Sequence, residues 1–162
     1  MGIYCVQINM KKLLLLLLLL SLGSSVIAED DYYDTAHKLA TCSGNFEISA
    51  DIFKSIGGGE AQITAIRERA NGWFIASVVF FMTDGMSSEG SWSSSQGVKD
   101  TTMSYWMARI ESSFNEFHSD EENMESFFKV VDELGDINTN ECIIYDELVE
   151  EAIKVFRRMA NS

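Results

Sequence analysis

Apolar residues recur at helical spacing along most of the chain after residue 31, and the 162-residue sequence contains no proline. In the first such segment they follow alternating steps of four and three from Tyr32 to Phe53, so they share one side of a helix. Gly57-Gly58-Gly59 follows, and glycine readily ends a helix. The pattern returns four more times with little sign of strand alternation. We therefore expect an all-α protein, a single bundle of about five amphipathic helices.

The second helix is predicted from about Glu60 to Thr83, and it is apolar on every side from Trp73 to Met82 except at Ser77. An element of that kind belongs at the centre of a bundle. The serine- and glycine-rich stretch 87–97 is predicted as a long surface loop. We interpret Trp92 in that loop as folding back over the bundle, and contact with a partner is the alternative.

The remaining helices are predicted over residues 97–118, from Ser119 to Gly135, and from about Asn140 onward. Ser119 with a glutamate three residues later forms a capping-box pattern, and Gly135 is expected to stop that helix. Their stripes are Met103, Met107, Ile110, Phe114 and Phe117; Met124, Phe127, Phe128, Val131 and Leu134; and Ile144, Leu148, Ala152, Val155 and Met159.

The N-terminus has the pattern of a cleaved secretory signal. Lys11 and Lys12 precede the leucine run 13–20, and Val26 and Ala28 are small residues suitably placed before a cleavage point. We expect residues 1–28 to be removed, leaving an acidic helical domain over residues 29–162 in the periplasm or outside the cell. An uncleaved membrane anchor is the alternative, although the apolar stretch is short for a span; after cleavage no stable membrane span is expected.

Removing residues 1–28 takes two of the 12 basic residues and none of the 25 acidic ones, so the mature charge is 10 − 25 = −15. Proteins that bind nucleic acid draw most of their affinity from basic side chains, so we expect no nucleic-acid partner. The charge is compatible with a cationic or protein partner and with solubility alone.

Two cysteines, Cys42 and Cys142, remain after Cys5 leaves with the signal. An even number in an exported chain favours a disulfide, and we predict that these two residues form it.

One segment resembles the calcium loop of the EF-hand family. Residues 136–147 place oxygen-bearing side chains at the family's positions one, three, five and twelve, where calcium ligands stand. Glu141 occupies position six, where the family has glycine. The resemblance implies a calcium site formed by Asp136, Asn138, Asn140 and Glu147. The alternative is a polar turn between helices, in which a side chain of residues 138–140 caps the last helix.

No motif assigns a catalytic residue, and we predict no resident cofactor besides that candidate calcium ion. His37 and His118, the two histidines, each have acidic neighbours, but one histidine at a solvated helix end is more typical of a surface residue than of a ligand. Eight methionines and ten phenylalanines would suit an adaptable binding surface. Most lie on the apolar stripes, so we interpret them as core.

These observations favour a small exported helical protein that acts by binding or as a structural accessory, without catalysis. A calcium-binding module and a small hydrolase with a dispersed site are the alternatives.

Overall fold

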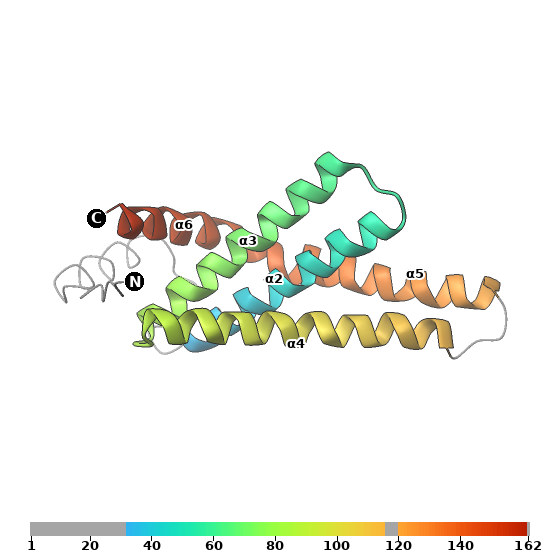
Figure 1. The fold of residues 1–162 in the computed structure, drawn as a ribbon, viewed down its shortest axis with the longest axis horizontal. Coiled ribbons are helices and arrows are strands. Elements are labelled where there is room, and N and C mark those ends of the chain that lie inside the picture. The colour runs from blue at the N-terminus through green and yellow to red at the C-terminus, as the bar shows by residue number, and fades with distance from the viewer. Residues whose placement is uncertain (1–31, 116–119, 162) are drawn as a thin grey trace, which may run out of the picture.

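A computed structural model describes residues 32–115 and 120–161, and within them all regular structure is helical (Figure 1). The predicted all-α bundle of about five helices is confirmed. The α-helices are α2 (Tyr32–Ser55), α3 (Glu60–Thr83), α4 (Ser88–Asn115), α5 (Asp120–Ile137) and α6 (Asp146–Ala160). A π-helical turn, η1 (Asn138–Cys142), and a 3₁₀ turn, η2 (Ile143–Tyr145), join the last two. The predicted signal peptide, residues 1–28, lies outside the described residues.

The first two helices form a hairpin whose bounds agree with the sequence prediction. Gly57 adopts a φ of 82°, a left-handed conformation that glycine tolerates at no steric cost. The backbone of Gly58 lies so close to Phe53 that a Cβ atom at this position would be 2.1 Å from the Phe53 ring. The glycine run therefore ends α2 and turns the chain into α3, for the conformational reason that the sequence indicated.

The α4–α5 hairpin packs across this first hairpin, and α6 returns along α3 (Figure 1). Helix α2 touches both α3 and α4, so it lies at the junction of the two hairpins. Gly44 marks its crossing with α4. A Cβ atom at this position would lie 2.8 Å from Cβ of Thr102 and 2.9 Å from the carbonyl oxygen of Lys99.

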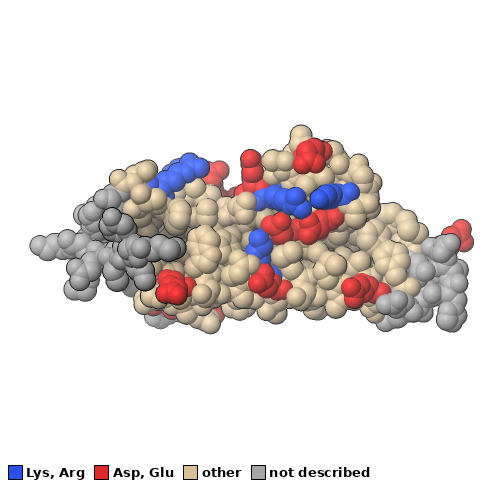
Figure 2. Space-filling view, in the orientation of Figure 1, with Lys and Arg blue, Asp and Glu red and all other residues tan. Residues whose placement is uncertain are grey.

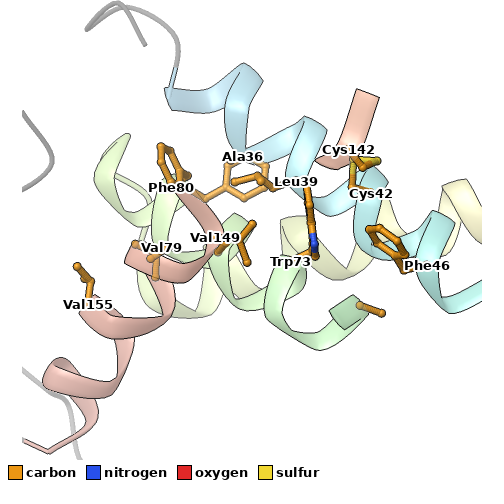
Figure 3. Packing of buried hydrophobic residues seen from close by; sticks show 14 residues of the cluster. Ala36, Leu39, Cys42, Phe46, Trp73, Val79, Phe80, Cys142, Val149 and Val155 are labelled. Carbon is orange, nitrogen blue, oxygen red and sulfur yellow. A yellow bond between two sulfur atoms is a disulfide. The ribbon is translucent and has the colours of Figure 1, made fainter. Parts of the chain in front are cut away.

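The core has two parts. The first joins α2, α3 and α6 around Trp73, Phe80 and Leu39, which are almost completely buried (Figure 3). The second joins α2, α4 and α5. Its buried members are Ile48, Ile52, Trp106, Phe127, Val130 and Leu134. Helix α2 contributes to both parts, because Ile48 and Ile52 lie on the side of the helix opposite the predicted stripe.

The prediction of a surface loop over residues 87–97 is wrong, because α4 begins at Ser88 and runs through this stretch. Ser87 caps it: its Oγ accepts a hydrogen bond of 3.1 Å from the backbone N–H of Gly90. Ser91 and Ser95 are fully buried, and the Ser95 hydroxyl lies 2.8 Å from that of Ser77 on α3. Small side chains let the helices approach closely, and their hydroxyls are satisfied there; tertiary packing thus outweighs the weak helix propensity of serine.

The prediction that Gly135 ends the fourth helix is also wrong, since α5 continues to Ile137 and passes into η1. Helix α6 begins at Asp146 rather than near Asn140. Arg157 and Arg158 lie in its last turn, where positive charge complements the helix dipole.

Candidate functional site

A cavity of about 320 Å³ opens between α2 and the irregular turns η1 and η2. Its α2 wall includes Lys38 and Thr41, and its opposite wall includes Asn140, Glu141 and Tyr145. An ammonium, a carboxylate, a hydroxyl and an amide thus border one hollow. Such a set can hold a small polar molecule by hydrogen bonds, but no single group dominates it.

The predicted pair Cys42–Cys142 forms a disulfide in the wall of this cavity. The two Cα atoms are 5.7 Å apart and 100 positions apart in sequence. Cys142 is completely buried beside the Trp73 cluster (Figure 3). The bond therefore attaches the chain between α5 and α6 directly to α2.

Asn138 begins the π-helical turn η1 and is buried against α2. Its amide nitrogen donates a 3.0 Å hydrogen bond to Oγ of Ser49, which donates to the Asn45 carbonyl oxygen. Its Oδ1 has no hydrogen-bond partner among the described residues. A π-turn is rare, and here it accompanies both a disulfide and a buried polar contact; these two attachments shape the segment.

The structure disperses the four predicted calcium ligands along a helical path. Asp136 is exposed in the last turn of α5, Asn138 is buried, Asn140 borders the cavity and Glu147 is exposed in the first turn of α6. In the described part of the chain, no three His, Cys, Asp or Glu side chains gather as a metal site would require. Calcium binding by these four residues stays an untested alternative that the EF-hand resemblance implies.

Three other residues were singled out from the sequence, namely His37, His118 and Trp92. His37 is exposed on α2, its ring centroid 6.5 Å from that of Tyr33. His118 lies outside the described residues. Trp92 does not fold back from a loop: it lies on α4, is 49% exposed, and sets its ring edge-on at 4.9 Å from Phe74.

The end of the α4–α5 hairpin carries the second candidate site. Phe114 on α4 is 44% exposed, and Met124 and Phe128 on α5 are 47% and 51% exposed. Buried Phe127 connects the two phenylalanines, its ring centroid 5.5 Å from that of Phe114 and 5.6 Å from that of Phe128. Met124 precedes Phe128 by four residues, so these two side chains are neighbours on the surface of α5. We call Phe114, Met124 and Phe128 the hairpin-end patch. It is a contiguous apolar surface open to solvent.

The sequence interpretation of these three residues as core is wrong. One signal could have revealed it: the apolar arc of α5 from Val130 through Phe127 to Phe128 spans about 160° of the helix at 100° per residue. Helix α5 packs mainly on α4 and less on α2, and these two helices leave part of so wide an arc exposed. Ile144 is a second residue of this kind, since it lies on a predicted stripe but is 70% exposed.

An ion pair also joins α4 and α5, the two helices of this hairpin. Arg109 donates to both carboxylate oxygens of Glu133, with a distance of 2.7 Å from Nη2 to Oε2. These hydrogen bonds lower the pKa of Glu133 and raise that of Arg109 from their ordinary values, and the opposite charges act in the same direction. Arg109 also lies over the Trp106 ring, 5.2 Å from its centroid.

A second set of ion pairs joins α2, α3 and α4. Glu47 accepts from Lys99 at 3.0 Å and lies 3.3 Å from Nε of Arg67, which also pairs with Asp51 at 2.7 Å. In Figure 2 basic and acidic side chains adjoin each other near the middle of the face shown. Because these cations already face carboxylates, this set is best interpreted as structural.

No described helix combines the length and the apolar character that crossing a membrane requires. Comparisons of the chain with protein-family models, with curated proteins and with solved structures gave no match.

Proposed function

We propose that this chain is an exported, non-enzymatic binding protein, whose disulfide-stapled helical bundle presents the hairpin-end patch to a partner protein. The observation that carries the proposal is the exposure of Phe114, Met124 and Phe128 in one contiguous surface around Phe127. The cavity beside the disulfide has no comparable concentration of one chemistry.

Apolar surface exposed to water is unfavourable by roughly 25 cal/mol per Å². Soluble monomers rarely keep large contiguous apolar patches unless these bind something. Phenylalanine and methionine are also enriched in interface cores, and methionine adapts its flexible side chain to the surface it meets. The composition of the patch therefore favours contact with another protein.

Export is supported by different observations. The segment from Lys11 to Ala28 has the order of a cleaved signal, and disulfides such as Cys42–Cys142 persist mainly in oxidising compartments. We propose a periplasmic or secreted location. Intact-mass measurement of the exported protein should give a chain that starts at Glu29; recovery from membranes of a chain that retains the leucine run would establish an anchor instead.

The binding role can be tested by affinity capture from the native compartment with quantitative mass spectrometry. The wild-type chain is compared with Phe128→Asp, which places a charge in the patch. The matched control is Ile56→Asp, because Ile56 is 60% exposed at the far end of the other hairpin. Both positions are exposed, so both variants should keep the far-ultraviolet circular dichroism of the wild type.

We expect the wild type and Ile56→Asp to retain the same partner and Phe128→Asp to lose it at least tenfold. Equal capture by all three proteins would refute a binding role for the patch. Loss with Ile56→Asp alone would move the binding surface to the α2–α3 hairpin.

A further inference from the structure

We infer that the hairpin-end patch binds a basic amphipathic helix of the partner protein. This inference rests on the proposed function and adds the chemistry of the bound segment. It follows from two independent features of the described residues: the shape of the uncovered face, and the charges that border it.

The shape follows from the unequal lengths of the helices. Near the middle of the α4–α5 hairpin, Ile48 and Ile52 of α2 cover Trp106, Val130 and Leu134. Helix α2 ends at Ser55, and the α4–α5 hairpin extends beyond the α2–α3 hairpin (Figure 1).

Met124 and Phe128 continue the apolar face of α5 into this uncovered part, and Phe127 lies at the boundary, 8% exposed. The hairpin-end patch is thus an extension of a surface that already receives a helix elsewhere. A second helix is the occupant that this surface suits.

The charges follow from the helical positions. On α5, Glu121, Glu125 and Asp132 are exposed at spacings of four and seven, so they form a row on one side of the helix, and the exposed Lys129 follows Glu125 by four residues at the edge of this row away from Phe128. Met124 and Phe128 form the adjacent row, four residues apart. An acidic row therefore runs beside the apolar row.

Helix α5 carries seven acidic residues and one basic residue. That basic residue is the exposed Lys129, which lies one turn from both Glu125 and Glu133 and contributes to lowering the pKa of Glu133; Arg109 is paired with the Glu133 carboxylate. On α4, Glu111 is exposed one turn before Phe114. The charged side chains visible near this end of the molecule in Figure 2 are acidic.

A complementary segment has an apolar stripe flanked by lysine or arginine. The acidic row spans residues 121–132, about 16 Å of helix at 1.5 Å per residue, which corresponds to about three turns in the partner. An acidic helix with the same stripe would face like charges along this row, and such juxtaposition opposes association. Charge complementarity therefore selects the basic helix.

The test titrates the disulfide-intact chain 29–162 with three synthetic 18-residue peptides by isothermal calorimetry. The first has leucine at positions i, i+3, i+4 and i+7 with lysine elsewhere. The second replaces every lysine with glutamate, and the third has the composition of the first in a scrambled order that abolishes the stripe. We expect the first peptide to bind at least tenfold more tightly than either control, and its affinity to fall between 50 and 500 mM salt.

Variants of the protein locate the binding. Phe128→Ser removes an apolar contact, with Ile56→Ser as its matched control. Glu121→Lys with Glu125→Lys reverses the acidic row, and Glu147→Lys with Glu150→Lys makes the same charge change on exposed positions of α6. We expect about tenfold weaker binding of the first peptide by each patch variant and less than threefold by each control.

Equal weakening by the two charge-reversed proteins would overturn the inference, because bulk acidity would then explain the binding. Equal affinity for the lysine and glutamate peptides would overturn it as well. If partner capture depends on Phe128 while the lysine peptide gains no advantage, the proposed function stands and this inference falls. If capture is indifferent to Phe128, the proposed function itself fails.

Discussion

Replacing Gly44 with alanine tests the close crossing of α2 and α4. Alanine is favoured over glycine in a helix interior by about 1 kcal/mol. At Gly44, however, the new methyl group would lie 2.8 Å from Cβ of Thr102 and 2.9 Å from the backbone oxygen of Lys99. Neither atom is the free end of a flexible side chain, so the helices must separate. Overpacking of this kind typically costs about 1–3 kcal/mol.

Gly97→Ala is the matched control for this substitution. Gly97 also lies inside a helix, α4, but a Cβ atom there would meet nothing within 4 Å. It should therefore show the propensity gain alone and raise the free energy of unfolding by up to about 1 kcal/mol. The difference between the two variants isolates the packing cost, which we expect to be about 1–3 kcal/mol.

The assay is urea and thermal unfolding of the disulfide-intact chain 29–162, followed by circular dichroism. For a domain of this size 1 kcal/mol corresponds to about 4 °C in Tm, so Gly44→Ala should melt roughly 4–12 °C below Gly97→Ala. Unfolding slopes should agree between the variants, so that the difference reports stability. Equal stabilisation by both substitutions would refute the close crossing.

Three further predictions concern the disulfide, calcium and acid. Reduction of Cys42–Cys142 should lower Tm by more than 10 °C, because closing a loop of about 100 residues removes on the order of 4.7 kcal/mol of unfolded-state freedom; two free thiols in the unfolded, unreduced chain would contradict the bond. Millimolar calcium should leave Tm at its value in EDTA. Asp136 and Glu147 are eleven residues apart on a helical path, whereas the oxygen ligands of one calcium ion lie within about 5 Å of each other. A rise in Tm of several degrees that Glu147→Gln abolishes would contradict this prediction. Hydrogen bonds from Arg109 lower the pKa of Glu133 in the folded protein below its ordinary value of 4.5. The Glu133 carboxylate should therefore stabilise the fold at pH values above 4.5, and this stabilisation should be lost as the pH falls through the pKa of Glu133 in the folded protein. Its side chain is 44% exposed, so Glu133→Gln should cost only about 0.2–1 kcal/mol at pH 7 and flatten the acid limb of the stability profile; an unchanged limb would argue against the pair.

Local chemistry made much of the bundle predictable. The spacing of apolar residues located α2 and α3, and the glycine run at 57–59 marked the turn between them because glycine alone takes the conformation found at Gly57 without strain. The pairing of Cys42 with Cys142 was predictable from the number of cysteines. With residues 1–28 removed, as we predict, Cys42 has one cysteine with which to pair, namely Cys142.

Other positions depended on neighbours far away in the chain. The stretch 87–97 resembles a loop by composition, yet Ser91 and Ser95 suit a helix whose close approach to α3 requires small side chains. Gly135 resembles a stop, yet the bond at Cys142 and the contact of Asn138 with Ser49 keep the chain helical beyond it. Propensity is a weak preference, and these tertiary contacts outweigh it.

The hairpin-end patch likewise combines features that are predictable from the sequence with one that depends on tertiary packing. Residue spacing is enough to predict the apolar stripe of α5 and the acidic residues beside it, because helical periodicity is a property of spacing alone. The exposure of Met124 and Phe128 depends on where α2 ends relative to the α4–α5 hairpin. The way in which the two hairpins cross sets that position. Gly44 is one residue on which this crossing depends, because its missing side chain lets α2 approach α4 closely. Periodicity is a local property of the chain, whereas exposure is the result of packing between segments that the sequence keeps apart.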